Sequence, residues 1–245
     1  DGSSLPSLAG DHKLEIKSAG FGDNIKWNYL VVAVVKDASC NCMWTIGDCS
    51  NWWANQLKGK KFSVKAVSIS DIDTLQEMQQ YKAILNPYGE QYPETSCTAN
   101  PASPGGYDCA ILDDIREYVK SGGYWFESGG FSFYYSCGAA PDLNGNADNH
   151  VCVDIGWEST TPRAKDAAFS SIIPNSPPSI TGSARPSIGM TESCGDNQNF
   201  KGLYKFSSPD RYGPSMHCYG TGCIVRTDNT DTVTVYADIL KTQIK

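Results

Sequence analysis

Two glutamates follow neighbouring predicted strands and could act as a catalytic pair. Glu127 ends the strand predicted over Tyr124–Glu127, and Glu90 lies in the loop after the strand predicted over Tyr81–Leu85. Glycosidases use one carboxyl group as acid and another as base or nucleophile, about 5 Å apart in retaining enzymes and farther in inverting ones. The alternative is structural: Glu127 accepts backbone N–H bonds in its turn, and Glu90 is a solvated loop residue.

A serine nucleophile is a second hypothesis for the same turn. Ser128 follows Glu127, and His217 could serve as its base, with His150 as the other available histidine. The complete Gly-x-Ser-x-Gly elbow is absent, because Phe126 stands two residues before Ser128. The alternative is a small residue in a tight turn and a surface histidine.

An alternating run of oxygen-bearing side chains could bind calcium. Asp142, Asn144, Asn146 and Asp148 form the pattern D-x-N-x-N-x-D, and short oxygen side chains at every second position can surround Ca²⁺. Ala147 occupies the place of the usual glycine, and no glutamate stands at the twelfth position. The alternative is an Asx-rich turn. No other cofactor is expected.

Side chains suited to holding a sugar follow the predicted strands. Flat aromatic rings with a polar edge stack on sugar faces, and a few polar groups fix the orientation of the ligand. The predicted ligand-binding residues are Trp44, Asn86, Tyr88, Tyr92, Gly129 and Trp157. For any single ring, packing in the core is the alternative. Trp52 and Trp53 are expected to split, one inward and one outward.

Strands and helices alternate through residue 130, which predicts a mostly parallel sheet flanked by helices, an α/β fold. The apolar, β-branched run Asn28–Lys36 is typical of a strand buried on both faces. Further strands are predicted at Phe62–Ser70, Tyr81–Leu85 and Tyr124–Glu127, and helices at Asp48–Lys58, Ser70–Tyr81 and Ala110–Ser121. The predicted N-caps are Asp48 or Ser50 for the first helix and Ser70 or Asp71 for the second. Ligands bind such sheets outside the carboxyl ends of the strands, here Asp37–Trp44, Asn86–Tyr92 and Glu127–Gly130.

The rest of the chain has a different character. Residues 134–214 are rich in Gly, Pro, Ser and Asn and are interpreted as a loop-rich insertion, with a strand at Cys152–Trp157 and a short helix near Arg163–Ser171. Strands at Ser215–Arg226 and Thr232–Leu240 are expected to form a C-terminal β-hairpin on the same sheet. The chain is expected to be one domain over 1–245, with its core in 28–133 and 215–240.

Composition limits the partners and the compartment. The net charge of −7 disfavours nucleic acid, and no apolar run is long enough to insert in a membrane. Ten scattered cysteines without a C-x-x-C pair favour up to five disulfides over a zinc site, which indicates an oxidising compartment. The polar start DGSSLPSLAGD is interpreted as a mature N-terminus after removal of a signal peptide, so a secreted protein is expected. Its oligomeric state is left open.

Four motifs occur in the order found in one superfamily. A strand ends at Asn86-Pro87-Tyr88-Gly89, a helix ends at Gly122-Gly123, and the next strand leads into Ser128-Gly129-Gly130. The fourth motif is His217-Cys218-Tyr219-Gly220-Thr221-Gly222-Cys223-Ile224-Val225, a glycine-containing hairpin. In this order they resemble the class I glutamine amidotransferase-like superfamily, and in particular its carbohydrate-linked members, such as the domains attached to β-galactosidases. The resemblance covers roughly residues 28–133 and 215–240.

The resemblance implies the fold but argues against amidotransferase chemistry. Active members carry a cysteine nucleophile within Gly-x-Cys-x-Gly, and this turn offers Glu127, Ser128, Gly129 and Gly130. Without a thiolate the acyl-enzyme cannot form. The sequence therefore predicts a secreted protein that binds or processes extracellular carbohydrate, or another small molecule, at its strand ends. The alternatives are a glycoside or ester hydrolase using Glu127 with Glu90 or Ser128 with His217, and a structural matrix or surface protein.

Overall fold

A computed structural model of the chain describes most of the predicted core. The residues it describes are 12–16, 25–29, 31–42, 48–89, 91–93, 97–99, 107–128, 133, 135–137, 162–181, 199–206, 212–227 and 232–244. The predicted strand at Cys152–Trp157 lies outside them.

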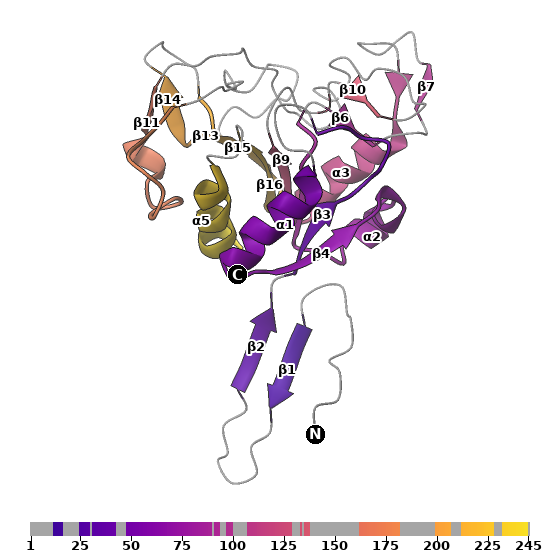
Figure 1. Cartoon of the computed structure of the whole chain (residues 1–245), viewed down its shortest axis with the longest axis horizontal. Coiled ribbons are helices and arrows are strands. Elements are labelled where there is room, and N and C mark those ends of the chain that lie inside the picture. Colours follow the sequence, from indigo (N-terminus) through magenta and orange to yellow (C-terminus); the bar gives the residue numbers. More distant parts are fainter. Residues whose placement is uncertain are drawn as a thin grey trace.

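A seven-stranded sheet forms the centre of the molecule, in the order β13-β15-β16-β9-β5-β3-β4 (Figure 1). The five strands from β16 to β4 are parallel, and β15 and β13 continue the sheet antiparallel. The strands are β3 (Val31–Val35), β4 (Ser63–Val67), β5 (Ala83–Asn86), β9 (Tyr124–Ser128), β13 (Phe200–Gly202), β15 (Ser215–Tyr219) and β16 (Gly222–Thr227). The predicted mostly parallel α/β fold is confirmed.

Smaller strands pair outside this sheet. β11 (Arg163–Lys165) lies between β12 (Ser179–Ile180) and β14 (Tyr204–Phe206) in an antiparallel sheet. The pairs are β1 (His12–Ile16) with β2 (Ile25–Tyr29), β6 (Gln91–Tyr92) with β10 (Tyr135–Ser136), and β7 (Thr98–Ala99) with β8 (Tyr107–Asp108).

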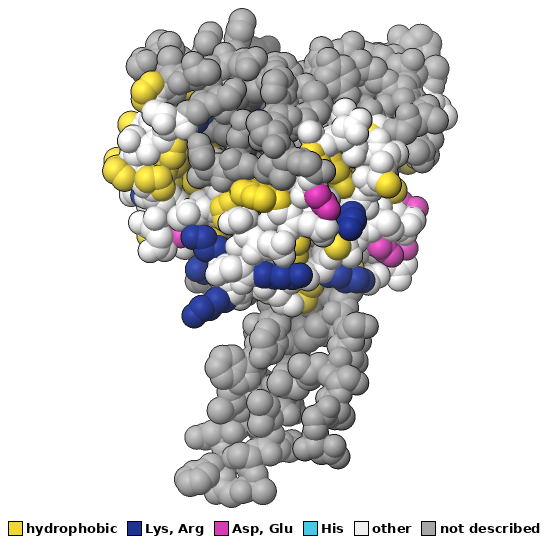
Figure 2. All heavy atoms as spheres, in the orientation of Figure 1, with side chains coloured by type: hydrophobic (Ala, Val, Ile, Leu, Met, Phe, Trp, Pro, Cys, Tyr) yellow, Lys and Arg dark blue, Asp and Glu magenta, His cyan; other side chains and the backbone are white. Residues whose placement is uncertain are grey.

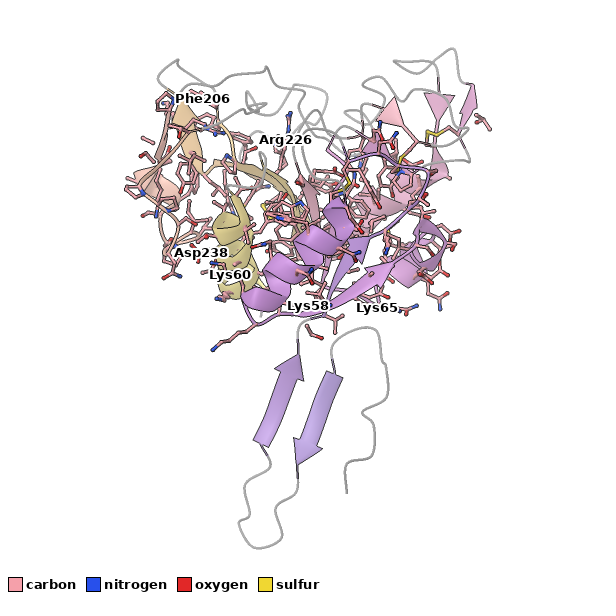
Figure 3. All side chains as sticks on the ribbon, in the orientation of Figure 1. Lys58, Lys60, Lys65, Phe206, Arg226 and Asp238 are labelled. Carbon is pink, nitrogen blue, oxygen red and sulfur yellow. A yellow bond between two sulfur atoms is a disulfide. The ribbon has the colours of Figure 1, made fainter. Side chains whose placement is uncertain are left out.

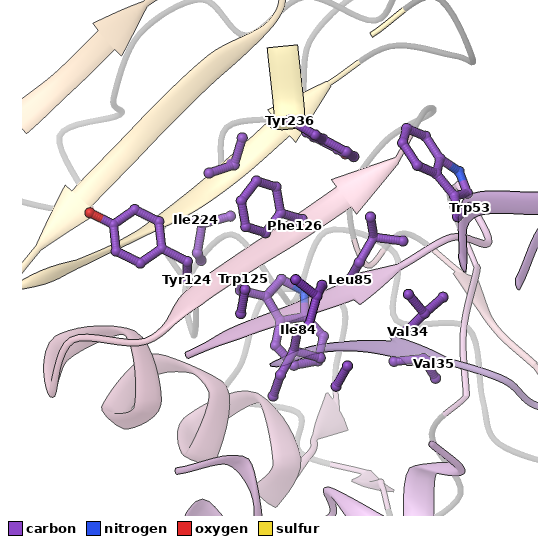
Figure 4. Close-up of a cluster of buried hydrophobic side chains, with 14 of the residues drawn as sticks. Val34, Val35, Trp53, Ile84, Leu85, Tyr124, Trp125, Phe126, Ile224 and Tyr236 are labelled. Carbon is purple, nitrogen blue, oxygen red and sulfur yellow. The ribbon is translucent and has the colours of Figure 1, made fainter. Parts of the chain in front are cut away.

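Helices cover both faces of the central sheet (Figure 1). The helices are α1 (Cys49–Gly59), α2 (Leu75–Met78), α3 (Ala110–Lys120) and α5 (Val233–Gln243), with 3-10 turns η1 (Ile69–Asp71) and η3 (Ala167–Phe169). α1 and α5 pack on one face, where Tyr236 contacts the rings of Trp53 and Phe126. α3 packs on the other face. Figure 4 shows Phe126 and Trp125 on opposite sides of β9, as the alternation of side chains along a strand requires.

Burial explains why the apolar runs become central strands. Every residue of β3 is buried, as expected for a parallel strand covered on both sides. Within α1, Trp53 is 1% exposed and Trp52 is only partly buried, so the predicted split of the two rings is observed. Asp48 caps this helix, and its side chain accepts a bond from the backbone N–H of Asn51.

Two glycine motifs meet where α3 ends. A Cβ on Gly222 would lie 2.1 Å from the carbonyl oxygen of Gly123, and one on Gly220 would lie 2.0 Å from that of Lys120. Backbone bonds join the same segments, from Thr221 N–H to Lys120 and from Cys223 N–H to Gly123. The glycines in the β15–β16 turn therefore let the hairpin backbone contact the end of α3 directly.

Three predictions of secondary structure need correction. Thr232–Leu240 is not a strand but most of helix α5, and the hairpin lies entirely within Ser215–Thr227. The run TVTVYADIL alternates like a strand, yet it also places apolar residues at helical spacing, and packing against α1 decides between the two. The second predicted helix contains only η1 and the short α2, which Thr74 caps. Arg163–Ser171 begins with strand β11 before the turn η3.

Four disulfides join described cysteines. They are Cys40–Cys137, Cys42–Cys49, Cys97–Cys109 and Cys218–Cys223. The first three attach segments that follow β3 and β5 to their neighbours, and the fourth closes the β15–β16 hairpin. Such bonds fit an oxidising, extracellular environment. Among the described helices, none is both long and apolar enough to span a bilayer.

Candidate functional site at the strand ends

Polar side chains form a row across the carboxyl ends of three adjacent parallel strands. Asn86 of β5 pairs in register with Glu127 of β9, which pairs with Arg226 of β16, and Ser215 of β15 continues the row. Residues paired across a sheet project from the same face. All four are buried, with exposed fractions between 0% and 2%. Polar groups are thus concentrated at the edge where α/β sheets bind ligands.

Glu127 is the centre of this row, and both of its carboxyl oxygens accept hydrogen bonds. Trp125 Nε1–H donates to Oε1 at 2.6 Å, and Asn86 Nδ2–H donates to Oε2 at 2.9 Å. Asn86 is held in turn, because its Nδ2 also donates to the carbonyl of Gln91 and its Oδ1 accepts from the backbone of Tyr88. The carbonyl of Glu127 accepts a 2.6 Å bond from the Tyr236 hydroxyl on the opposite face. The position of this carboxyl group is therefore tightly fixed.

Burial dominates the electrostatics of Glu127. Loss of water raises the pKa of the carboxyl group to about 8, against the lowering effects of the Trp125 and Asn86 bonds and of the nearby Arg226 charge. Glu127 is therefore mostly protonated at neutral pH. A neutral buried acid can donate a proton or a hydrogen bond that an exposed glutamate would have lost.

A second polar group lies beside this row, where β3 meets α1. The hydroxyl of Tyr88 accepts a bond from the backbone N–H of Asp37, lies 2.9 Å from Ser50 Oγ and donates to the Asp37 carbonyl. Ser50 Oγ donates to the carbonyl of Val35, the last residue of β3. Burial is the main cause that raises the pKa of Tyr88. This group joins the loop after β5 to the carboxyl end of β3.

Aromatic rings pack beneath the row. Tyr92, Trp125 and Phe133 contact one another with ring centroids 5.2–6.0 Å apart, and each is fully buried. Tyr92 was predicted as a sugar platform, whereas the structure places its ring in this cluster. The cluster supports the indole that donates to Glu127.

Register separates the predicted serine and histidine. Ser128 adjoins Glu127 along β9, so the two side chains point to opposite faces of the sheet. His217 pairs with Ile224, which pairs with Trp125, so it lies on the Glu127 face. His217 is fully buried, and its ring lies 4.8 Å from that of Phe200. The geometry does not bring Ser128 and His217 together.

Several predicted site residues lie outside the described part of the chain. They are Glu90, Trp44, Gly129, Trp157, Asp142, Asn144, Asn146 and Asp148. The Glu127–Glu90 pair and the calcium site thus remain predictions. Within the described residues, no group of three or more His, Cys, Asp or Glu side chains is placed to hold a metal.

Sequence reasoning missed Arg226 and Ser215 as parts of this row, and Trp125 as the donor to Glu127. A signal was available for Arg226, since an arginine inside the apolar run Cys223–Arg226 must be paired or functional if the strand is central. Ser215 and Trp125 gave no such signal, because serine and tryptophan are common in ordinary strands and their neighbours depend on register.

Several solved structures resemble this chain in fold. A ThuA-like protein from Bacteroides uniformis shares 11% identity over 92% of this chain and 96% of its own, with a TM-score of 0.52. A cytoplasmic protein from Salmonella typhimurium shares 12% over 88% of this chain and 100% of its own, with a TM-score of 0.54. The β-galactosidase of Rahnella sp. R3 shares 13% over 86% of this chain but only 30% of its own, with a TM-score of 0.55.

These likenesses show the fold and nothing more specific. No protein-family model matches the chain, and no match was found among curated proteins. The turn after β9 reads Glu127-Ser128-Gly129-Gly130 and contains no cysteine. The chain thus resembles the ThuA-like protein in fold, which fits the suspected class I glutamine amidotransferase-like superfamily, and its turn after β9 carries no cysteine.

Proposed function

We propose that this protein binds extracellular carbohydrate at the carboxyl ends of its parallel strands, without amidotransferase activity. One observation carries the proposal: Asn86, Glu127 and Arg226 lie in register on three adjacent strands at the edge where this class of sheet binds ligands. Burying three such groups is unfavourable unless they are hydrogen-bonded, so their concentration at one edge favours a functional role over a purely structural one.

The chemistry of the row suits a polyhydroxylated ligand. An amide, a protonated carboxyl group, a guanidinium and a hydroxyl together offer both donors and acceptors, which sugar hydroxyls need. The adjoining aromatic cluster is buried, and it holds the Trp125 indole that positions Glu127 at the same edge. These features support carbohydrate as the ligand class.

Binding is favoured over catalysis by the surroundings of Glu127. Both of its oxygens are occupied by protein donors, and the residue is 0% exposed. A catalytic acid must reach the proton it transfers in a substrate complex. The second candidate is a hydrolase that uses Glu127 as general acid. Its pKa of about 8 favours that role, because such an acid still carries its proton at neutral pH.

A glycan array combined with a broad hydrolase screen separates these functions. The proteins to compare are the wild type, Glu127→Gln and the control Glu117→Gln. Glu117 is exposed on α3, where its side chain bonds Lys120, so its substitution removes a carboxylate far from the strand ends. Folding of each variant is checked by circular dichroism before binding is scored.

The outcomes discriminate the functions directly. We expect the wild type and Glu117→Gln to bind the same glycans without turnover, and Glu127→Gln to bind about ten-fold more weakly, because its amide cannot accept both existing bonds. Turnover that disappears in Glu127→Gln would favour the hydrolase, and turnover that survives would exclude Glu127 as its acid. A blank array without turnover would contradict both and favour the structural alternative.

A further inference from the structure

Five exposed lysines gather at the end of the molecule opposite the strand-end row. Lys58 lies in the last turn of α1, Lys60 and Lys61 follow it, Lys65 is on β4, and Lys241 is in the last turn of α5. We call this set the lysine rim. Figure 3 labels Lys58, Lys60 and Lys65 along this border, and Figure 2 shows basic side chains gathered there. The chain as a whole carries −7, so the rim is a local reversal of charge.

The elements that carry the rim contain almost no opposing charge. α1 and β4 have no carboxylate, and the one carboxylate of α5, Asp238, is buried and bonded to Asn175 and Ser176. Among the described residues, no rim lysine lies within ion-pair distance of an acid. Hydrogen bonds from Ser68 are the main cause that lowers the pKa of Asp71, and the charge of Lys65 is a lesser cause. Like charges in one place repel, so their accumulation calls for an explanation.

The rim lysines are exposed, although the ammonium groups of three of them also contact the protein. Lys241 lies 5.7 Å from the ring centroid of Phe62, and Lys65 lies 5.7 Å from that of Tyr81 and donates to its hydroxyl at 3.1 Å. Lys60 reaches Thr234 Oγ1 at 3.5 Å. A cation in the last turn of a helix interacts favourably with the helix dipole, which explains the positions of Lys58 and Lys241. Lys61 and Lys65 lie outside helices, so this effect does not explain their positions.

We propose that the lysine rim is a docking surface for an acidic polysaccharide. Several ammonium groups, which lack the fixed fork geometry of a guanidinium, match repeated carboxylate or sulfate groups along a flexible chain. The four disulfides indicate an oxidising compartment, whereas anionic lipid is characteristic of the cytoplasmic leaflet. The two rim aromatics Phe62 and Tyr81 lie under lysines and are not exposed, so they offer no anchor for a membrane. This proposal does not depend on sugar binding at the strand ends.

Binding to defined polymers tests the rim. The probes are heparin, polygalacturonate, neutral dextran, and phosphatidylcholine vesicles containing phosphatidylserine, each titrated at low salt and again at rising salt. The variant is the triple Lys58→Gln, Lys60→Gln, Lys61→Gln. The control is the triple Lys120→Gln, Lys201→Gln, Lys205→Gln, which changes the net charge equally on α3, β13 and β14.

We expect the wild type to bind heparin or polygalacturonate but not dextran, with affinity that falls as salt rises. The affinity of the rim triple for the polyanion should fall about ten-fold or more, and the affinity of the control triple should stay within about two-fold of the wild type. No binding of either polyanion at low salt, or equal loss in both triples, would overturn the proposal. Tighter binding to the vesicles than to both polymers would assign the rim to a membrane surface instead. Neutral glycans on the array should bind the rim triple and the wild type equally.

Discussion

At the scale of single residues, one buried acid organises the carboxyl edge of the sheet. Glu127 has no exposed surface, receives donors from Trp125 and Asn86, and has a pKa of about 8. The folded protein therefore binds a proton more tightly at this group than the unfolded chain does. Its stability contribution is fully present below the ordinary pKa of a glutamate and is lost as the pH rises through about 8.

This linkage predicts a pH dependence specific to Glu127. The free energy of unfolding of the wild type, measured relative to Glu127→Gln, should fall as the pH rises from about 4.5 to about 8, on the order of 1 kcal/mol per unit. Below about pH 4.5 and above about pH 8, the difference in the free energy of unfolding between the two proteins should not change with pH. Denaturant titrations of both proteins from pH 4 to 9 measure it. A difference that rises with pH would show an ionised carboxylate stabilised by Arg226.

The hydroxyl of Tyr88 gives a second prediction at this scale. Tyr88→Phe should cost about 1–3 kcal/mol, because Asp37 and Ser50 lose a partner in a buried place. The matched control is Tyr81→Phe, which removes a hydroxyl bonded to the exposed Lys65 and should lower the free energy of unfolding by less than about 1 kcal/mol. Equal losses measured by urea unfolding would mean that the Tyr88 group does not hold β3 to the loop after β5.

At the scale of elements, the contact between the β15–β16 turn and the end of α3 depends on glycine. Gly220 has φ +61 and would place a Cβ 2.0 Å from the Lys120 carbonyl oxygen. Gly220→Ala should therefore lower the free energy of unfolding by about 2–4 kcal/mol. Gly59 ends α1 with open space around it, so Gly59→Ala should be neutral or stabilising by about 0.5–1 kcal/mol. Thermal and urea unfolding of both variants measure the contrast, and similar effects at the two sites would refute this account.

Elements were predictable where the pattern fitted only one structure. The apolar run of β3, the capped helix α1, the amphipathic helix α3, and the order of strands and helices through β9 all follow from the sequence. Thr232–Leu240 failed because its residues fit both a strand and a helix, and only packing against α1 and β9 selects the helix. The order of the glycine motifs indicated the fold before the structure showed that the hairpin and α3 motifs touch.

The site was predictable only in part. The strand-end rule located Glu127 and Asn86, because Glu127 ends one predicted strand and Asn86 directly follows another. Arg226 and Ser215 join them through register across β16 and β15, and register depends on contacts that lie far apart in the chain. The same register separates Ser128 from His217, a pair that their residue types allowed and the incomplete elbow motif did not favour.

At the scale of the whole molecule, disulfides tie distant segments to the sheet. Cys40–Cys137 closes 97 residues, whereas Cys218–Cys223 closes only 5. A cross-link that closes a longer loop restricts the unfolded chain more. Cys40→Ala with Cys137→Ala should therefore lower the free energy of unfolding by about 5 kcal/mol, and Cys218→Ala with Cys223→Ala should lower it by about 2 kcal/mol. Guanidinium unfolding under non-reducing conditions compares the two double variants. The reverse order would mean that the hairpin bond stabilises the native state itself.

The molecule thus places two chemically different surfaces at opposite ends of one sheet. The strand-end row is buried and polar, and the lysine rim is exposed and basic (Figures 2 and 3). Separate variants can test them, because Glu127→Gln and the rim substitutions lie on different elements. The proposal for the strand ends is the central one.

The indole N–H signal of Trp125 tests that proposal most directly. Trp125 donates to Glu127, so a ligand that contacts the row must change the environment of this proton. The experiment is a titration with an array-selected glycan followed by ¹⁵N–¹H NMR, in which the variant Trp125→Phe assigns the indole signal. We expect the glycan to shift the Trp125 indole resonance and to leave that of Trp52 on α1 unchanged. A saturating glycan that leaves the Trp125 signal in place would contradict binding at the strand ends.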